Sequence, residues 1–337
     1  MFCRLATGVA GRFSGAGVFV YNDLEMPELP EVETIARGLN RKLKGRKITG
    51  LWTDWPKYFS ARGGFPSGGG RSRGEAAFRR HLVGKSITGV SRRAKNIFIH
   101  LSDNHLLLIH QKMTGHLMVG KWKPFKNQKV EERWQNQKWI PDPPRGPLMD
   151  PMNRFIRLIF FLDNGTMLAL SDLRRFAKVV CGPRTEILNA EDIKKLGPEP
   201  LQPDFTFKKF SALFKGKRGR LKQVLTDQNF ISGVGNIYAD EILWVARIHP
   251  LKKVENLKEK YLRTIFGAMK KILRKALRLR GTSIDDYRDA AGRRGGYDQV
   301  RYVYQREGEA CPRCGAKIKR LKIGGRSAHF CPRCQKI

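Results

Sequence analysis

Four cysteines near the end of the sequence form two pairs whose spacing suits a bound metal ion. Cys311 and Cys314 have two residues between them, and Cys331 and Cys334 repeat this spacing sixteen residues further on. Two such pairs can present four thiolates in a tetrahedron, the coordination that Zn²⁺ adopts in structural sites. The pattern indicates no fifth ligand, so we expect one structural zinc ion whose binding holds this small unit folded.

A glycine-rich turn precedes an expected helix in the second half of the sequence. The segment reads Ile231-Ser-Gly-Val-Gly-Asn236, and its two glycines favour a tight turn. Backbone N–H groups at the start of a helix bind phosphate well, and the side chain of Asn236 can add a donor. Such a turn is more often plain geometry, so it gains weight only from the motifs that accompany it.

The net charge favours an anionic partner. The chain has 66 Lys and Arg against 30 Asp and Glu, which gives a formal charge of +36. Charge of one sign costs stability by self-repulsion unless a partner neutralises it. A lysine- and arginine-rich chain of this kind most often binds nucleic acid. A merely basic, solvated surface is the alternative, and an anionic membrane surface is less favoured because no basic amphipathic anchor stands out.

Hydropathy and cysteine usage favour a cytoplasmic protein. No stretch reaches the roughly 18 consecutive apolar residues that a transmembrane helix needs. The two remaining cysteines, Cys3 and Cys181, are isolated, which argues for reduced thiols and against a secreted disulfide framework. We therefore expect a soluble protein of a reducing cytoplasm.

The first half of the sequence predicts an antiparallel sandwich or barrel with one helix. The helix is expected from about Glu31 to Leu43, because its apolar residues recur at helical spacing. Short segments of β character are Ile48–Trp52, Ser86–Ser91, Asn96–Leu101, His105–His110, Phe155–Leu162 and Thr166–Leu170. Two irregular stretches, Arg62–Gly74 and Lys121–Pro151, are predicted to be surface loops.

The second half of the sequence predicts helices. Pro and Gly punctuate the chain at 196–200, and we place a domain boundary near 190–203. The expected helices are Phe207–Phe214, Leu221–Asp227, Ile237–Ala246 and Leu257–Leu279. The fold class is therefore α+β, with a β-rich domain followed by a helical one.

Six motifs occur in an order that resembles one enzyme family. They are Met26-Pro-Glu-Leu-Pro-Glu-Val-Glu33, Arg92-Arg-Ala-Lys95, His110-Gln-Lys-Met113-Thr-Gly, Asp172-Leu-Arg174-Arg-Phe176, the glycine turn, and Gly325-Arg326-Ser-Ala-His-Phe-Cys331. From Met26 to its last residue the chain resembles the formamidopyrimidine-DNA glycosylases, DNA-repair enzymes that remove oxidised purines. The resemblance implies a catalytic β-sandwich domain at 26–190, a linker at 191–203, a helix-two-turn-helix domain at 204–298 and a β-hairpin zinc finger at 299–337.

The resemblance implies that Pro27 is the nucleophile. An α-amine has a pKa near 8, so a useful fraction is neutral at pH 7 and can attack the sugar carbon C1′. The attack expels the damaged base, leaves a Schiff base, and is followed by strand cleavage through β- and δ-elimination. By resemblance Glu28 is the acid/base for base loss, Lys95 is a proton donor in β-elimination, and Arg326 serves δ-elimination.

The resemblance also implies residues that hold duplex DNA. The void left by an extruded base is filled by Met113, Arg174 and Phe176. The phosphate contacts are expected from Arg157, Arg218, Lys222 and Asn236, together with Lys95 and Arg326. The segment Gly281–Tyr297 corresponds to the mobile loop that closes over the base, with Ser283 and Tyr287 as candidate contacts. Several of these side chains, Met113 and Phe176 above all, could instead belong to the core.

Twenty-five residues precede Met26, which departs from the family pattern. An amide nitrogen is not nucleophilic, so Pro27 can react only if nothing precedes it. We expect that residues 1–25 are absent from the mature protein and that Met26 is the true start. Cleavage of the extension and a catalytically inactive chain are the alternatives.

Smaller departures concern the DNA contacts. Phe155 stands where the family has a phosphate-binding histidine, which leaves Arg154 or Arg157 as the substitute. Leu173 and Ala177 replace the usual proline and glycine around the Arg-Arg-Phe motif, and we expect them to alter the loop backbone only. The insertion 121–151 is longer than the resemblance predicts and suggests no role.

Two rival functions stay open on the sequence. An endonuclease VIII-like glycosylase would remove oxidised pyrimidines, but Leu29 argues against it because that branch has glycine there. A DNA-binding protein without activity would result if Pro27 stayed blocked. In each case we expect a monomer in the cytoplasm, associated with the nucleoid, that binds damaged double-stranded DNA.

Overall fold

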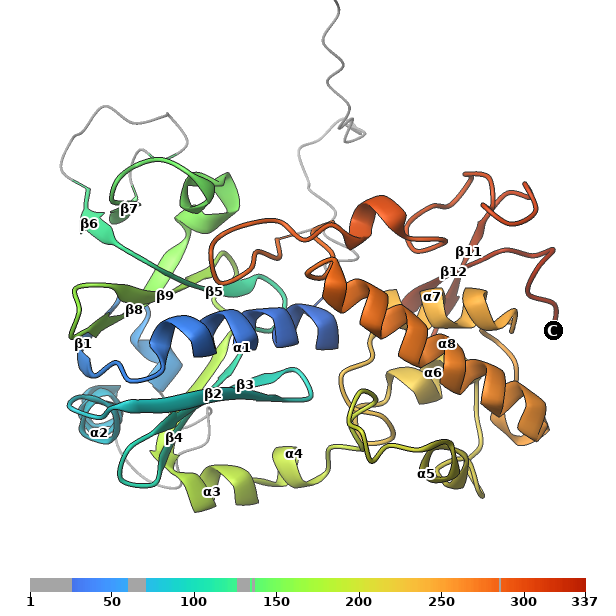
Figure 1. The fold of residues 1–337 in the computed structure, drawn as a ribbon, viewed down its shortest axis with the longest axis horizontal. Coiled ribbons are helices and arrows are strands. Elements are labelled where there is room, and N and C mark those ends of the chain that lie inside the picture. Colours follow the sequence, from blue (N-terminus) through green and yellow to red (C-terminus); the bar gives the residue numbers. More distant parts are fainter. Residues whose placement is uncertain (1–25, 60–70, 126–133, 135–136, 285) are drawn as a thin grey trace, which may run out of the picture.

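The first half of the chain folds into two four-stranded antiparallel sheets (Figure 1). The computed structural model describes residues 26–59, 71–125, 134, 137–284 and 286–337. In neighbour order, one sheet contains β1 (Ile48–Thr53), β8 (Ile156–Leu162), β9 (Met167–Asp172) and β5 (Gly115–Gly120), and the other contains β10 (Lys178–Pro183), β4 (His105–His110), β3 (Asn96–Leu101) and β2 (Ile87–Arg93). The sequence predicted six of these eight strands, and it missed β5 and β10.

The two sheets pack face to face around one apolar core. Alternate residues of β8, Leu158 and Phe160, meet Ile97 and Ile99 of β3 in this core. The period of two along each strand explains why these residues face inward together. The predicted sandwich is therefore confirmed.

Helix α1 (Leu29–Leu43) joins the sandwich to the helical half of the molecule, as Figure 1 shows. Val32, Ile35 and Leu39 belong to the sandwich core. Leu29, at the first turn, belongs instead to the core of the helical half. The N-terminus of α1, and with it Pro27, therefore lies where the two cores meet.

The second half is helical, as the sequence predicted. Short helices α3 (Arg184–Asn189) and α4 (Glu191–Lys194) lead to α5 (Phe207–Ala212), α6 (Leu221–Thr226), α7 (Asn236–Ala246) and α8 (Glu259–Arg278). The hairpin β11 (Lys319–Ile323) and β12 (Arg326–Phe330) follows. Among the described residues, no helix combines the length and apolar character that crossing a membrane requires.

The two predicted surface loops contain more structure than expected. Part of Arg62–Gly74 lies outside the described residues, but α2 (Arg71–Leu82) begins within it. Within 121–151 the strands β6 (Trp122–Pro124) and β7 (Trp139–Pro141) pair, and Trp134 is fully buried. The loop prediction was wrong for these parts. Within 121–151 the apolar residues serve local packing and show no steady period, and the Gly/Arg-rich composition of 62–74 gave no sign of a helix.

Candidate active site between the sandwich and the helical domain

Glu28 links the start of α1 to the start of α7. Its side chain is fully buried, and its carboxylate accepts hydrogen bonds from the backbone N–H of Gly235 at 2.7 Å and of Ile237 at 2.8 Å. Beside it, the N–H of Leu29 donates to the Gly233 carbonyl at 2.9 Å. These helix N–H groups, which the sequence predicted as phosphate ligands, therefore bind a carboxylate of the protein.

Gly235 brings Lys95 close to the same carboxylate. A Cβ atom at position 235 would lie 2.5 Å from the Glu28 carboxylate and 2.7 Å from Lys95 Nζ. Real Cβ atoms do not approach other atoms that closely, so only glycine fits here. The predicted residues Glu28 and Lys95 thus meet at one backbone position.

Pro27 lies in a pocket at this junction. The pocket is lined by Met26, Pro27, Glu31, Met113, Ile237, Thr282, Ile284 and Tyr287. Its walls therefore come from the start of α1, the β4–β5 turn, α7 and the segment after α8. The structure brings the predicted nucleophile, Met113 and the 281–297 segment together around one small space.

Glu31 ties three parts of the pocket together, and sequence reasoning had assigned it no role. Its carboxylate accepts from the Glu28 N–H at 3.0 Å, the Thr282 N–H at 2.8 Å and the Tyr238 hydroxyl at 2.5 Å. Burial raises the pKa of Glu31, while these donors act in the opposite direction. The sequence did contain a signal for this role. Glu31 follows Glu28 by three residues, the spacing of a capping box, in which each side chain accepts from the backbone N–H of the other residue.

A buried ion-pair network holds the turn that carries Lys95. Arg92 donates to Glu199 at 2.6 Å and to Glu33 at 2.8 Å, and Glu199 also accepts from the Ala94 N–H at 2.5 Å. Ala94 has a left-handed backbone conformation with φ of 52°. The linker residue Glu199 thereby fixes the backbone directly before Lys95.

Met113, Arg174 and Phe176 form a cluster at the protein surface. Arg174 lies 3.4 Å from the Met113 sulfur, and its guanidinium stacks over the Phe176 ring at 4.5 Å. Phe176 is 50% exposed, which excludes the core role left open by the sequence.

Asp172 anchors the loop that presents these side chains. It is fully buried and accepts from Thr114 Oγ1 at 2.5 Å and from the Ala177 N–H at 2.9 Å. Thr114 in turn accepts from the Arg174 N–H at 3.0 Å. Replacing the expected Pro and Gly with Leu173 and Ala177 leaves this anchoring in place.

The structure gives the other predicted DNA ligands different surroundings. Arg157 pairs with Asp54 at 2.9 Å, Asn236 is buried at the first turn of α7, and Arg218 is exposed between α5 and α6. Of these three residues, only Arg218 is exposed in the structure.

Lys222 was predicted to bind DNA, but in the structure it is buried and contacts protein groups. Its side chain is 3% exposed and pairs with Asp240 at 2.6 Å. Its ammonium group also donates to the Ser327 carbonyl of β12, and Asp240 accepts from the His329 N–H at 2.8 Å. Lys222 therefore anchors the C-terminal hairpin to α6 and α7.

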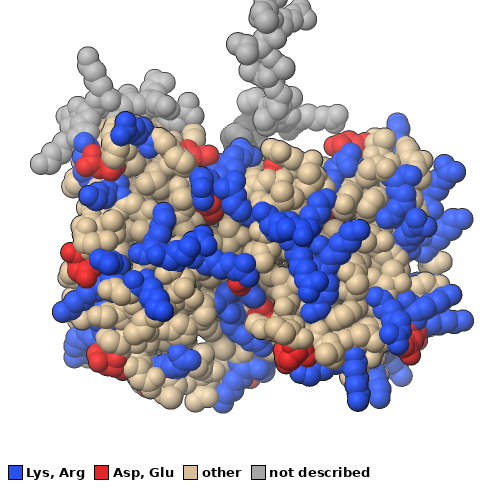
Figure 2. Space-filling model, in the orientation of Figure 1, with Lys and Arg blue, Asp and Glu red and all other residues tan. Residues whose placement is uncertain are grey.

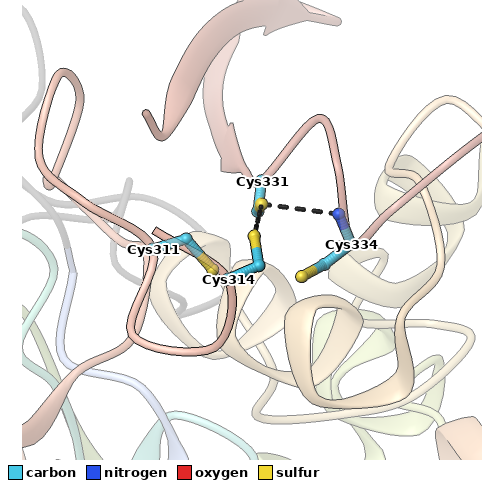
Figure 3. Close-up of side chains that lie close together, drawn as sticks. All are labelled: Cys311, Cys314, Cys331 and Cys334. Atoms are coloured by element: carbon cyan, nitrogen blue, oxygen red, sulfur yellow. Dashed lines mark hydrogen bonds between the residues drawn. The ribbon is translucent and has the colours of Figure 1, made fainter. Parts of the chain in front are cut away.

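The four cysteines converge as the zinc prediction requires (Figure 3). All four sulfur atoms lie within 4.8 Å of one another. Tetrahedral Zn–S bonds of about 2.3 Å place sulfurs about 3.8 Å apart, so the cluster fits one zinc ion with little adjustment. Arg326, at the start of β12, is exposed beside the left-handed Gly324–Gly325 turn.

Basic side chains dominate the face of the molecule shown in Figure 2. Between α1 and the segment after α8, a pocket is lined by Arg37, Arg41, Lys42, Arg280 and Arg293 around the single carboxylate of Asp289. The excess charge is therefore distributed over both halves of the chain and is not confined to the finger.

Three family models match this chain. The formamidopyrimidine-DNA glycosylase N-terminal domain matches residues 26–179, the formamidopyrimidine-DNA glycosylase H2TH domain matches 196–288, and the zinc finger found in FPG and IleRS matches 308–337.

Curated relatives and solved structures agree with these models. The formamidopyrimidine-DNA glycosylase of Pelotomaculum thermopropionicum is 36% identical over 93% of this chain and 100% of its own length. That of Chloroflexus aurantiacus is 36% identical over 92% of this chain and 98% of its own length. The structure of Lactococcus lactis Fpg with abasic-site DNA has a TM-score of 0.74 and 30% identity, and covers 92% of this chain and 100% of that one. The chain belongs to the formamidopyrimidine-DNA glycosylase family.

Proposed function

We propose that this protein is a bifunctional DNA glycosylase and abasic-site lyase that removes oxidised purines from duplex DNA. The observation that carries the proposal is the position of Pro27 in a pocket beside the buried Glu28 and the Lys95 turn. Similar solved structures hold DNA with an abasic site or with Fapy-dG, which supports this substrate class.

Pro27 starts the reaction as a nucleophile. Its nitrogen forms a bond to C1′ of the damaged nucleotide, and the bond between C1′ and the base breaks with its electron pair leaving on the base. Opening of the sugar ring gives an iminium adduct, whose positive charge makes the neighbouring C2′ protons acidic. Loss of such a proton expels the 3′ phosphate, and a second elimination expels the 5′ phosphate.

The proton transfers are assigned to Glu28 and Lys95. Glu28 is fully buried and is held by backbone donors at the start of α7. Such fixed donors hold the carboxylate in one place at the start of α7, one residue after Pro27 in the sequence. Lys95 supplies a proton during β-elimination, and the Arg92–Glu199 network keeps its turn in place.

The remaining predicted residues contact the DNA in this proposal. Met113, Arg174 and Phe176 fill the space that the extruded base leaves, because they form an exposed apolar and cationic cluster beside the pocket. Arg218, Asn236 and Arg326 hold phosphates, and Arg326 assists the second elimination.

The proposal requires a free amine on Pro27. In the sequence as written this nitrogen is an amide, and the family model for the N-terminal domain begins at Met26. We therefore propose that residues 1–26 are absent from the active enzyme. The intact mass of the native protein tests this, since a mass that includes residues 1–25 would contradict the catalytic role of Pro27.

Borohydride trapping on defined duplexes tests the activity itself. We expect a covalent adduct with an oligonucleotide that contains 8-oxoguanine, because borohydride reduces the iminium to a stable amine. An adduct formed only with an oxidised pyrimidine would instead show the endonuclease VIII-like activity. Tight binding without an adduct would show a protein that recognises lesions but does not process them.

A further inference from the structure

One wall of the Pro27 pocket comes from the segment 281–297. Thr282, Ile284 and Tyr287 of this segment line the pocket opposite Pro27. Tyr287 is 7% exposed, and its carbonyl accepts hydrogen bonds from Ser283 Oγ at 2.7 Å and from Arg288 Nη1 at 2.8 Å. Because Arg288 binds the Tyr287 carbonyl, the position of Tyr287 in this wall depends on the contacts that hold Arg288.

Arg288 is held by a residue of the insertion. Its guanidinium is 4% exposed and pairs with the Asp150 carboxylate at 2.9 Å. One guanidinium thus bridges Asp150 and the carbonyl of the wall residue Tyr287. Loss of the Asp150 carboxylate would take a close charge partner from a buried guanidinium, which is unfavourable.

A residue just after the insertion, Asn153, holds the wall segment at a second point. Asn153 Nδ2 donates to the Gly292 carbonyl at 3.2 Å and to the Pro147 carbonyl at 2.8 Å, and its Oδ1 lies 2.9 Å from His116 Nε2 in β5. A Cβ atom at position 292 would lie 2.7 Å from Asn153 Nδ2. Gly292 is therefore fitted closely against residues 147–153, which we name the supporting segment.

The supporting segment is itself fixed to the sandwich. Leu148 packs with Met118 and Trp122 on the outer face of the sheet that contains β5. The fully buried Trp134 donates from its indole N–H to the Met149 carbonyl at 3.3 Å. Because the segment is fixed to the sheet, its contacts can restrain the position of residues 287–292.

We propose that the supporting segment positions the wall of the Pro27 pocket and thereby determines how well the enzyme accepts an extruded base. Asp150 and Asn153 are positioning residues, since they act through Arg288 and Gly292. This inference rests on the proposed function. It gives a role to the last residues of the insertion 121–151, for which the sequence suggested none.

A positioning role and a general loss of stability can be distinguished by comparing base excision with cleavage of an abasic site. Excision of 8-oxoguanine needs an ordered pocket wall around the base, whereas cleavage of an abasic duplex places no base there. In the enzyme that begins at Pro27, we expect Asp150→Ala to lower the single-turnover excision rate about tenfold and to change abasic cleavage less than about twofold. Amide hydrogen exchange at 286–292 becomes faster.

Two further variants serve as controls. Asp142→Ala removes the same charge from the insertion, but Asp142 is 48% exposed and pairs with Lys123 at 3.2 Å, so both rates should stay unchanged. The double variant Asp150→Ala/Arg288→Met should lose no more excision than Arg288→Met alone, because the two residues act as one unit.

The proposal is overturned if Asp150→Ala excises 8-oxoguanine normally, or if excision and abasic cleavage fall equally. A parent enzyme that processes neither substrate would contradict the proposed function and not the positioning role. In that case exchange at 286–292 decides: faster exchange in Asp150→Ala supports the role, and unchanged exchange overturns it.

Discussion

At the scale of single residues, the site depends on one position where a side chain is excluded. Gly235→Ala places a methyl group 2.5 Å from the Glu28 carboxylate and 2.7 Å from Lys95 Nζ, so both groups must move. We expect the excision rate to fall at least about 100-fold, equivalent to ~2.7 kcal/mol in the barrier. The single-turnover rate on an 8-oxoguanine duplex is the measurement.

Gly89→Ala is the matched control for this substitution. Its added methyl group would meet only Asn40 Oδ1, at an ordinary contact distance of 3.5 Å. Its excision rate should equal that of the parent enzyme. Normal excision by Gly235→Ala would show that Glu28 and Lys95 do not need their present positions.

A second residue makes stability depend on pH. Burial lowers the pKa of His116 to about 4, and the charge of Arg288 acts in the same direction. Because the folded pKa lies below the ordinary value, the unfolded chain takes up this proton first, and stability falls as the pH decreases from about 6.5 to 4. Between pH 7 and 5 we expect His116 to account for a loss of about 2 kcal/mol.

Urea unfolding at these two pH values measures the effect. His116→Gln keeps a donor toward Asn153 but cannot titrate, so the difference between its two unfolding free energies should be about 2 kcal/mol smaller than in the parent protein. An equal difference in both proteins would mean that His116 is not held neutral by its surroundings.

At the scale of elements, buried charges connect segments that are distant in the sequence. Glu28 joins α1 to α7, Glu199 joins the linker to β2, and Asp240 joins α7 to the C-terminal hairpin. Each carboxylate binds backbone N–H groups or a buried cation from another element. The relative positions of the elements therefore depend on a few buried polar contacts.

Lys222→Met tests one of these connections. It leaves Asp240 buried without its cation, so we expect the free energy of unfolding to fall by about 3 kcal/mol. Lys322→Met, on an exposed position of the same hairpin, should change it by less than about 0.5 kcal/mol. If Lys222→Met weakened DNA binding at unchanged stability, Lys222 would be a phosphate ligand after all.

The elements that the sequence could predict are those with a clear period or a defined spacing. The β character of Asn96–Leu101 and the helical spacing in α1 and α8 predicted those elements closely. Strand β5 was missed because it is apolar on both faces and is bounded by Gly115 and Gly120. The sequence motifs identified Pro27, Glu28 and Lys95 as candidates, whereas their shared contact at Gly235 depends on tertiary packing.

The sequence could not predict contacts between residues that belong to no motif. Asp150 and Arg288 are 138 positions apart, and neither belongs to a motif. The resemblance implied Lys222 as a DNA ligand, and only the fold shows that it is buried and pairs with Asp240. The spacing of residues can predict a metal site or a helix. Which side chains pair across domains is known only once the fold is known.

At the scale of the whole molecule, the zinc finger and the start of α1 beside Pro27 are joined through α7. Trp244 of α7 donates from its indole N–H to the Cys311 sulfur at 3.4 Å and stacks on Tyr302. At its other end, α7 binds Glu28 through its first N–H groups. One helix therefore carries both the hairpin with Arg326 and the carboxylate beside Pro27.

Loss of the zinc ion should accordingly abolish function while most of the fold is kept. Cys314→Ser removes one of four ligands, and we expect DNA binding and base excision to be lost together, because the hairpin that carries Arg326 loses its metal support. The sandwich and helical cores contain residues far from the finger, so the circular dichroism of the variant should stay close to that of the parent protein. Cys181→Ala, in the sandwich core, should retain zinc and activity. Excision by a Cys314→Ser protein without bound zinc would show that the hairpin and Arg326 are dispensable, and that the chemistry belongs to the junction around Pro27 alone.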